Sequence, residues 1–332
     1  MTVIVPTLRG GPSLERTIAC LRAQTFRDFS TVVVDNSGVG VARELHAPPE
    51  VLVIDNKTNV GFGEAINQGL GTSTAEYFAT LNDDAYADPE WLQELVASAD
   101  TDPPTVGMYA CQIRLSDEPS ILDSAGLDIY PDGTTKQRGN GERAEKFVEP
   151  GEVLLPSGCA ALYRRAMIDQ VGAFDGSYFL YCEDTDLGLR GRLAGFRCHY
   201  VPTAVVEHDY SRSSGRASAM KAFYVERNRL YTVAKTFPLI LWPLTPIYSL
   251  WRYLAHGVVA AQGRGLAGDI RNDQGFASLV GIILSAHWHA MLAFPKLWRA
   301  HRELRARTTL GTWSFIRLLK RHSVSAWKIA KQ

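Results

Sequence analysis

The sequence predicts an α/β protein with a mostly parallel sheet and helices on both of its faces, followed by a basic, amphipathic helical region. Short apolar segments rich in β-branched residues alternate with helical patterns through the first part of the chain. Charge also divides the chain. Residues 1–210 contain 16 Lys and Arg against 31 Asp and Glu, whereas residues 211–332 contain 19 against 4. An acidic body and a basic end favour two functional parts.

The elements of the first 106 residues follow from local signals. Pro6 ends the first apolar run, and Ser13 is a typical cap for the helix after it. Strands are expected at residues 2–5, 31–34, 51–54 and 77–81, and helices at 13–24, at 64–70 and from about 88. Ligands bind at the carboxyl ends of such parallel strands, so the residues that follow them are candidates for a site.

The pattern is mixed between residues 107 and 210. A long strand is expected at 153–163, helices at 165–171 and 184–194, and a polar loop or lid at 131–150. We expect one domain over residues 1–210, with a ligand-binding part at about 1–106 and a second part at about 107–210. Residues 211–332 are expected to form the separate helical region.

The five cysteines are widely spaced and contain no C-x-x-C pair, which does not favour a disulfide framework or a zinc site. The chain starts with MTVIVPT, which leads directly into a strand. It has neither the charged segment nor the apolar segment of a secretory signal. We therefore expect a reducing, cytoplasmic compartment.

Two adjacent carboxylates, Asp83 and Asp84, follow the strand that ends at Leu81. Such a pair repels itself unless a cation or a hydrogen-bond donor lies beside it. Mg²⁺ and Mn²⁺ prefer oxygen ligands of this kind, and a diphosphate can supply the remaining ligands. A solvated acidic turn is the alternative, but the buried strand before the pair favours a metal.

Three carboxylates, Glu183, Asp184 and Asp186, lie at the start of a predicted helix. Acidic residues stabilise a helix N-terminus, but one or two would be enough for that purpose. Phe179 and Tyr181 precede them. A carboxylate held against apolar side chains has a raised pKa and can act as a general base.

Three further features have a structural and a functional interpretation. Asp35 either accepts a hydrogen bond from the N3–H of uracil or thymine, or closes a turn. The glycine-containing segment 59–67, NVGFGEAIN, either lets the backbone approach a ligand or forms a plain tight turn. His208 is a structural histidine unless it lies near Asp84, in which case it is a candidate ligand.

Together these segments resemble one protein family. In chain order they are PT, VVVDNS, NVGFGEAIN, LNDD, LPSGCAALYRR, VGAFDGSYFLYCEDTDLGLR and VVEHDYSRSS. The series is similar to that of family-2 glycosyltransferases with the GT-A fold, and it covers about residues 1–235. The bacterial rhamnosyltransferase-like members also share the FYVERNRLY segment found at residues 223–231.

The resemblance implies a role for each matching residue. Asp184 would be the catalytic base, and Asp84 with His208 would bind Mg²⁺ or Mn²⁺. Gly158 and Glu183 would lie on the side of the donor sugar and the acceptor. Contacts to the nucleotide-sugar are expected from Pro6, Thr7, Asp35, Asn59, Gly61, Asn67, Asn82 and Asp83.

The activity implied by the resemblance is that of an inverting hexosyltransferase. It would move a sugar from dTDP-rhamnose or a UDP-sugar to a lipid-linked or polysaccharide acceptor at the cell surface, by a metal-assisted single displacement. Two departures concern the donor: Asn82 stands where many relatives have Asp, and the acidic residue common after Asp35 is missing.

Two alternatives belong to other classes. A sugar-1-phosphate nucleotidyltransferase would use a glycine-rich loop after the first strand, and Arg9, Gly10 and Gly11 lie there. That reading leaves the Glu-Asp motif and the basic region unexplained. A non-catalytic paralogue that binds nucleotide-sugars is the second alternative, and the presence of both Asp84 and Asp184 argues against it.

The basic region predicts an anionic membrane surface as a partner, and not nucleic acid. Trp313, Ile316, Leu319 and Trp327 fall broadly on one helical face with Lys and Arg beside them, although such a helix could also pack on the acidic body. Residues 274–295 contain no Asp, Glu, Lys or Arg and are long enough to span a bilayer. One span would put the basic C-terminus outside, against the positive-inside tendency. Peripheral attachment to the inner face of the cell membrane is therefore expected.

Overall fold

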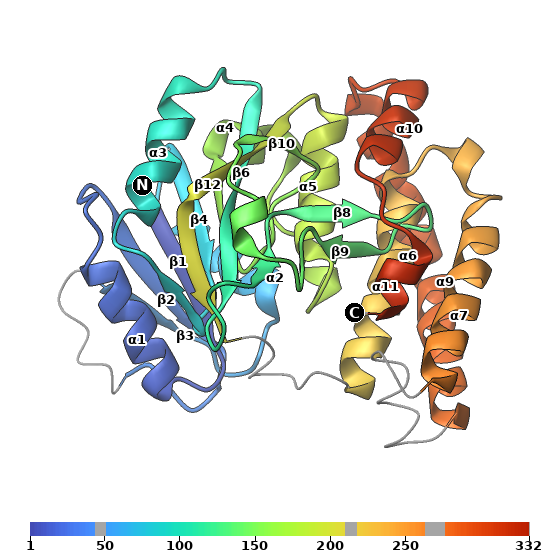
Figure 1. Cartoon of the computed structure of the whole chain (residues 1–332), viewed down its shortest axis with the longest axis horizontal. Coiled ribbons are helices and arrows are strands. Elements are labelled where there is room, and N and C mark those ends of the chain that lie inside the picture. Colours follow the sequence, from blue (N-terminus) through green and yellow to red (C-terminus); the bar gives the residue numbers. More distant parts are fainter. Residues whose placement is uncertain (44–50, 210–217, 263–275, 332) are drawn as a thin grey trace. The chain divides into compact units, whose positions relative to one another are not determined.

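The computed structural model describes residues 1–43, 51–209, 218–262 and 276–331 (Figure 1). The chain divides into two compact units. Unit 1 contains residues 1–127 and 137–213, and unit 2 contains residues 128–136 and 214–332. The chain thus leaves unit 1 after residue 127, contributes a short segment to unit 2 and then returns. Nothing in the local sequence pattern of that segment indicated this.

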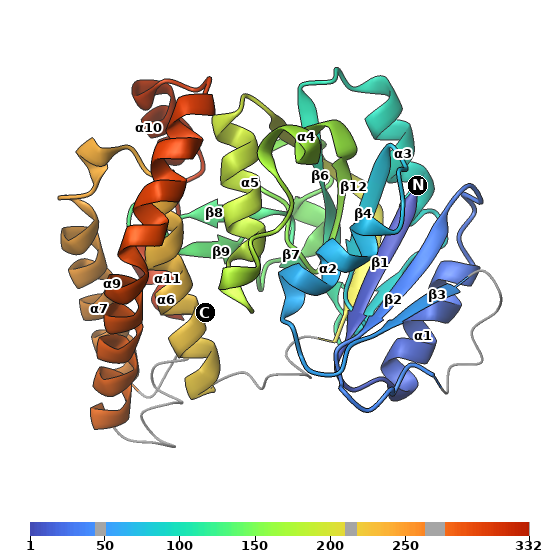
Figure 2. The ribbon, with the colours of Figure 1, turned by 180° about the vertical axis from the view of Figure 1, so that it is seen from behind.

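Unit 1 is built on a sheet with the strand order β10-β12-β6-β11-β4-β1-β2-β3 (Figures 1 and 2). The strands β3, β2, β1 and β4 run parallel to one another, and β6 and β12 are also parallel, whereas β11 lies antiparallel between β4 and β6. Short β5 and β7 pair with β12 and β6. The bounds are β1 Thr2–Thr7, β2 Ser30–Asp35, β3 Val51–Asp55, β4 Tyr77–Leu81, β5 Ala85–Ala87, β6 Val106–Leu115, β7 Leu122–Ser124, β10 Gly151–Val153, β11 Ala160–Arg164 and β12 Arg197–His208.

Helices cover both faces of this sheet. Val3 and Val5 of β1 point into a core shared with α1 (Gly11–Arg22) and α3 (Trp91–Thr101). Ile4 points into the opposite core, as the alternation of a strand requires. That second core is shared with α2 (Phe62–Gly71), α4 (Arg165–Val171) and α5 (Glu183–Leu193). The predicted α/β class is confirmed.

Two expected segments differ in detail. The long strand expected at 153–163 was wrong: β10 and β11 are separate strands, and β10 pairs with β12 at the edge of the sheet. Pro156 and Gly158 lie in the break between them. The polar segment 131–150, expected as a loop, contains β9 (Thr135–Gln137) and the short 3₁₀ helix η1 (Ala144–Lys146). β9 pairs with β8 (Leu127–Ile129) in a two-stranded hairpin.

The described part of unit 2 is helical apart from the hairpin residues. Its elements are α6 (Ala219–Thr236), η3 (Leu239–Leu241), α7 (Thr245–Ala261), α9 (Phe276–Arg307), α10 (Thr312–Arg321) and α11 (Ala326–Lys331). α9 packs along α6, and α7 packs against α11. A small core joins Tyr130 of the hairpin to apolar residues of α7 and α11.

The apolar face expected near the C-terminus is not formed as predicted. Leu319 is buried in α10 together with Phe315, whereas Trp313 on the same helix is 70% exposed. The helix therefore turns part of the expected face inward. Residues 274 and 275 of the uncharged stretch lie outside the described residues. From residue 276 the stretch belongs to α9, the one described helix whose length and composition would allow it to cross a membrane, and only 6% of its apolar window is buried.

Candidate active site

Polar side chains gather where the parallel strands end. Thr7 closes β1, lies beside Asp35 of β2 in register, and donates a hydrogen bond of 2.5 Å from its Oγ1 to Asp83 Oδ2. Burial raises the pKa of Asp83 to about 6, and Asp84 adds to this effect while the bond from Thr7 opposes it. The predicted edge of the sheet thus brings Thr7, Asp83 and Asp84 together.

His208 lies beside Asp84, as the ligand hypothesis required. Its Nε2 is 3.3 Å from Asp84 Oδ1, and its Nδ1 is 2.8 Å from Asp123 Oδ2. Both carboxylates are buried. Burial disfavours the charged imidazolium, but the contacts with Cys159, Asp123 and Asp84 outweigh that cost and raise the pKa of His208 well above its usual value. His208 therefore joins β12 to the acidic pair after β4.

Asp123 is a site residue that the sequence did not reveal. It lies on β7, which pairs with β6, and it is 3% exposed. Asn140 donates hydrogen bonds from its Nδ2 to both the backbone and the side-chain oxygen of Asp123. Asp123 belongs to no recognisable motif, and 85 residues separate it from His208. Only the pairing of β7 could have placed it here.

The three carboxylates at the start of α5 have different surroundings. Asp184 accepts hydrogen bonds from the backbone N–H of Gly158 at 2.9 Å and of Thr185 at 2.6 Å, and it keeps partial solvent exposure. Glu183 is buried, and its Oε2 has no hydrogen-bond partner. Asp186 is fully buried and forms an ion pair of 2.8 Å with Arg190, so it is a structural residue.

Glu183 and Asp184 also differ in what sets their pKa. It raises the pKa of Glu183 to about 8, with a further contribution from the neighbouring Asp184. Burial raises the pKa of Asp184 as well, but the hydrogen bonds from Gly158 and Thr185 oppose that rise. Burial therefore favours the protonated form of Glu183, whereas Asp184 is the carboxylate whose ionised form its neighbours stabilise.

The glycine-rich turn before α2 packs directly on the loop before α5. Phe179, Tyr181 and Cys182 all have positive φ angles, a strained conformation for residues with a side chain. The backbone N–H of Phe62 donates a 2.8 Å bond to the carbonyl of Phe179. A Cβ atom on Gly61 would lie 2.4 Å from that carbonyl oxygen, so only glycine permits the contact.

Gly158 and Cys159 join the two groups of carboxylates. The N–H of Gly158 bonds to Asp184, and the carbonyl of Cys159 accepts a 2.8 Å bond from the N–H of Asn82. Cys159 also contacts His208. The acidic pair with its histidine and the Asp184 carboxylate are therefore linked through two consecutive residues.

Two other predicted contacts make internal bonds. The carboxylate of Asp35 is 1% exposed and accepts 2.8 Å bonds from the N–H groups of Ser37 and Ala42, so it closes the turn after β2. The Asn67 amide both donates to and accepts from the backbone of Phe174. The roles of Asp35 and Asn67 in binding a nucleotide-sugar stay predictions.

Asn59 and Pro6 occupy turn and strand positions. The Asn59 Oδ1 accepts a 2.9 Å bond from the N–H of Gly61, which shapes the turn before α2. Pro6 lies on buried β1 beside Val34 of β2. Neither arrangement tests the expected contact with a donor.

The donor set suits a divalent cation that is shared with a ligand. Asp84 offers a carboxylate oxygen and His208 an imidazole nitrogen directed at it. Within the described residues, no group of three or more His, Cys, Asp or Glu side chains could hold an ion alone. Mg²⁺ usually takes one or two protein carboxylates and completes its shell with phosphate oxygens and water. The residues present fit such a shared site.

Comparison with known proteins gives the chain a family context. The family model described as glycosyl transferase family 2 matches residues 2–172. The chain is 29% identical over 242 residues to the N-acetylglucosaminyl-diphospho-decaprenol L-rhamnosyltransferase of Mycobacterium tuberculosis. This alignment covers 66% of this chain and 79% of the relative. Over 67 residues, 20% of this chain and 25% of the relative, it is 45% identical to the rhamnosyltransferase WbbL of Escherichia coli.

Solved structures share the fold. GalNAc-T7, solved with UDP, GalNAc and Mn²⁺, aligns with a TM-score of 0.58 at 16% identity, over 89% of this chain and 57% of that one. TarS of S. aureus aligns with a TM-score of 0.52 at 14% identity, over 99% of this chain and 54% of that one. The chain thus spans little more than half of these two proteins, and the likeness establishes a GT-A-type fold.

Proposed function

Because the chain belongs to glycosyl transferase family 2 and is a glycosyltransferase, we propose that it inverts the transferred sugar in a single displacement onto a lipid-linked acceptor. The observation that carries this proposal is the pairing of two different sites across Gly158 and Cys159. Asp184 accepts a bond from the N–H of Gly158, and the next residue, Cys159, contacts His208, which lies beside Asp84. A base and a site for the leaving group on opposite sides of the sugar are what an in-line attack needs.

Asp184 takes the proton of the attacking hydroxyl group in this proposal. Gly158 and Thr185 hold the Asp184 carboxylate in one orientation, and partial exposure leaves it open to an acceptor. Burial favours the protonated form of Glu183 next to it, and in that form Glu183 adds no second negative charge beside the base. A positioned general base contributes about 10²–10⁴-fold to the rate.

Asp84 and His208 would hold Mg²⁺ or Mn²⁺ together with the diphosphate of the donor. When bound, such an ion neutralises the charge that develops on the leaving diphosphate. Asp123 holds the Nδ1 of His208 so that Nε2 faces Asp84. A second carboxylate in this position is typical of histidines that bind metals, since it fixes the tautomer and the orientation of the ring.

The names of the relatives support the proposed substrates. One relative is a decaprenol-linked N-acetylglucosaminyl rhamnosyltransferase, and a second is a rhamnosyltransferase. We propose dTDP-rhamnose as the first donor to test, UDP-sugars as the second, and a polyprenyl-diphosphate glycan as the acceptor, in the synthesis of a cell-surface polysaccharide. Residues 1–210 would carry catalysis, and the basic residues after 210 would hold the enzyme at the cytoplasmic face of the membrane.

A donor panel tests the proposal. Purified enzyme is incubated with dTDP-rhamnose and with UDP-sugars, a polyprenyl-diphospho-N-acetylglucosamine acceptor and Mg²⁺ or Mn²⁺, and the released nucleoside diphosphate is measured. NMR of the product then gives the anomeric configuration. We expect acceptor-dependent release with one donor and an inverted anomeric carbon. Retention of configuration would contradict the single displacement, and release of pyrophosphate from a sugar-1-phosphate and a nucleoside triphosphate would support the nucleotidyltransferase alternative.

A further inference from the structure

Large exposed apolar side chains are concentrated in unit 2. Of the 22 such residues in the described part of the chain, 18 belong to unit 2 and four to unit 1. Monomeric soluble proteins rarely expose contiguous apolar patches of large size, so a concentration of this kind marks an interaction surface. The two helices that contribute most to it are α7 and α9.

Helix α7 presents one uncharged face to its surroundings. Its exposed apolar residues recur at helical spacing, with 40–64% of each side chain exposed: Ile247, Tyr248, Leu250, Trp251, Leu254 and Val258. Arg252 is the only charged residue of the helix, and it is buried. A face built in this way has no charge that would oppose transfer into an apolar medium.

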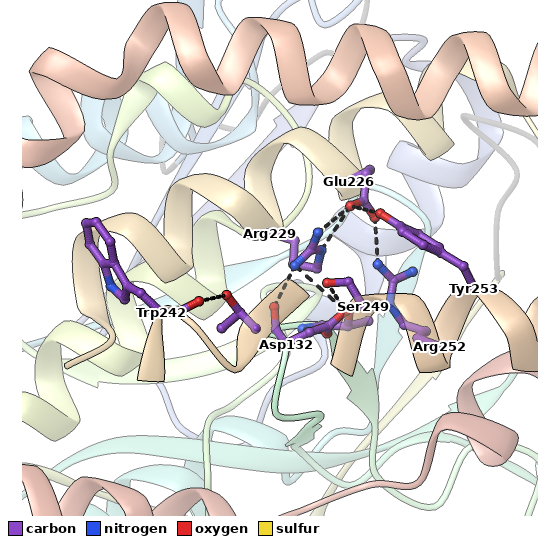
Figure 3. A network of polar contacts seen from close by, with 9 residues as sticks. Asp132, Glu226, Arg229, Trp242, Ser249, Arg252 and Tyr253 are labelled. Carbon is purple, nitrogen blue, oxygen red and sulfur yellow. Dashed lines mark hydrogen bonds and ion pairs between the residues drawn. The ribbon is translucent and has the colours of Figure 1, made fainter. Parts of the chain in front are cut away.

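A buried ionic network keeps Arg252 away from that face (Figure 3). Arg252 donates 2.7 Å and 2.8 Å bonds to Asp132 of the hairpin and to Glu226 of α6. Arg229 of α6 bonds to the same two acidic residues. Since these bonds hold α7 to both the hairpin and α6, they set which side of α7 remains outside.

Helix α9 has an uncharged half and a basic half. Residues 276–295 contain no Asp, Glu, Lys or Arg, whereas residues 296–307 contain five Lys and Arg and one Glu. The uncharged half exposes Val280, Leu284, Trp288, Met291 and Leu292. At its junction with the basic half, Phe294 and Trp298 pack with Trp242. Aromatic residues between an apolar and a basic zone are typical of a membrane interface.

We propose that the outward faces of α7 and of the uncharged half of α9 insert into the boundary between headgroups and acyl chains of an anionic membrane. α9 packs along α6, and Arg252 bonds α7 to Glu226 of the same helix, so both faces belong to one helical unit (Figures 1 and 2). The Lys and Arg that follow residue 295 supply the attraction to anionic lipids that such a surface needs.

The sequence between the two helices opposes a membrane-spanning hairpin. It contains Arg264, Asp269, Arg271 and Asp273, and carrying these charges across the hydrocarbon would be costly. Helices that lie along the surface leave them in water. A second copy of the chain is the other occupant to consider, but the 19 Lys and Arg against 4 Asp and Glu after residue 210 would repel an identical surface.

The inference deepens the proposed function, because it identifies the part of the chain that would reach a lipid-linked acceptor. It can be tested without catalysis. Six of the seven tryptophans lie in unit 2, and Trp91 is the exception. Their fluorescence therefore reports on unit 2, and lipids with brominated acyl chains quench tryptophans that enter the acyl region.

The experiment uses vesicles of phosphatidylcholine with phosphatidylglycerol, with and without brominated lipid. Trp251 and Trp288, both 55% exposed, lie on the proposed faces, whereas Trp313 on α10 is 70% exposed and lies outside them. We expect Trp251→Phe and Trp288→Phe each to reduce quenching by the brominated lipid and Trp313→Phe to leave it unchanged. Loss of quenching with Trp313→Phe alone would overturn the assignment of the face to α7 and α9.

Vesicle sedimentation in low and high salt supplies the second arm. The double variant Leu250→Glu and Leu254→Glu should bind at least about tenfold less tightly, since two exposed leucines no longer enter the acyl region. Val148→Glu in unit 1, at a residue that is 56% exposed, is the matched control and should bind as the parent does. Circular dichroism confirms folding, and Leu284→Glu on α9 replaces the double variant if that variant is unfolded.

The outcomes separate the possible occupants. Binding that persists in high salt, with quenching at Trp251 and Trp288, supports insertion. Binding that high salt abolishes, without quenching, overturns insertion in favour of a purely electrostatic attachment. A dimer that the two leucine substitutions dissociate, with no vesicle binding, overturns the membrane as the occupant. Donor turnover onto a soluble acceptor is measured in parallel, so that failure of the proposed activity is distinguished from failure of the membrane surface.

Discussion

Two adjacent carboxylates differ because their hydrogen bonds differ. Glu183 has a buried oxygen without a partner and a pKa of about 8, whereas Asp184 accepts bonds from Gly158 and Thr185. The sequence placed both acids at a helix start, but it could not show which of them has donors around it. Gly158, which donates one of these bonds, lies 26 positions before Asp184 in the sequence.

Exchange of each carboxylate for its amide tests this difference. We predict that Asp184→Asn keeps donor affinity but lowers transfer on the order of 10²-fold or more, as the loss of a general base should. Glu183→Gln mimics the protonated side chain and should cost much less activity. Both are measured as initial rates at saturating donor, with donor affinity from calorimetry. A larger loss in Glu183→Gln would reverse the two roles.

The position of Asp123 behind His208 gives a second prediction at this scale. Without the carboxylate at Nδ1, the imidazole loses its fixed tautomer. Asp123→Ala should lower the affinity for Mn²⁺ in the presence of nucleoside diphosphate by about 10–100-fold. Calorimetric titration of the metal measures this without turnover. Asp175→Ala, at a carboxylate that caps a short 3₁₀ helix, is the control. Equal affinities in the parent and Asp123→Ala would refute the positioning role.

Sequence reasoning succeeded at this scale where one local signal was enough. Asp83 and Asp84 lie at the end of β4, and His208 lies beside Asp84, as the hypothesis required. Asp123 was missed because its position depends on the pairing of β7 with β6, which no local pattern records. The expected donor contacts of Asp35 and Asn67 remain predictions, since both side chains already make internal bonds.

At the scale of elements, the contact between the turn before α2 and the loop before α5 is the least tolerant part of the site. Gly61 has a φ of +88°, and its missing side chain makes room for the Phe179 carbonyl. The glycine pattern predicted a close approach but not its partner. The partner is the strained Phe179–Cys182 segment of the chain itself, directly before Glu183 and Asp184.

Gly61→Ala should therefore disturb the base as well as the fold. We predict a loss in the free energy of unfolding of about 1–3 kcal/mol or more, together with reduced turnover. Gly71→Ala at the C-terminal end of the same helix meets no atom within 4 Å and should leave activity unchanged, with stability equal or higher by up to about 1 kcal/mol. Chemical denaturation and initial rates measure both. Equal behaviour of the two alanine variants would show that the close contact at Gly61 does not matter.

The elements themselves were largely predictable. Strands with β-branched residues and helices with apolar periodicity were found near their expected places, since local pattern determines them. The expected cap at Ser13 was wrong, because α1 begins at Gly11 and Gly10 is its N-cap. The exception at 153–163 is instructive, because an apolar run continues through Pro156 and Gly158 while the chain moves from the sheet edge at β12 to the place between β4 and β6. Continuity of hydrophobic residues does not imply continuity of a strand.

For the whole molecule, the division of charge predicted a basic helical region, and the structure adds a buried ionic network inside it. Arg229 and Arg252 lower the pKa of both Asp132 and Glu226 below their usual values, against the effect of burial. A carboxyl group whose pKa is lower in the folded state stabilises the fold above its unfolded pKa. That contribution is lost as the pH falls through the lowered value. Unit 2 should therefore lose stability below about pH 4.

Removal of one arginine tests the network. Arg252→Met leaves two buried carboxylates with one cationic partner fewer, and we predict a loss of about 3–5 kcal/mol in the stability of unit 2. Arg143→Met breaks an exposed pair with Glu145 in unit 1, which water screens, and should leave stability nearly unchanged. Tryptophan fluorescence follows the unfolding of unit 2 at neutral and acid pH. The account would be contradicted if the stability of unit 2 in the parent did not fall at acid pH. It would also be contradicted if both variants lost the same stability.

The measurement that tests the central claim most directly is donor binding by calorimetry, with and without Mg²⁺ or Mn²⁺, in the parent and in Asp84→Ala. The claim is that Asp84 with His208 shares a divalent cation with the donor diphosphate while Asp184 acts on the acceptor. The account predicts that metal strengthens donor binding in the parent and in Asp184→Asn but not in Asp84→Ala. Equal metal dependence in Asp84→Ala and the parent would contradict it.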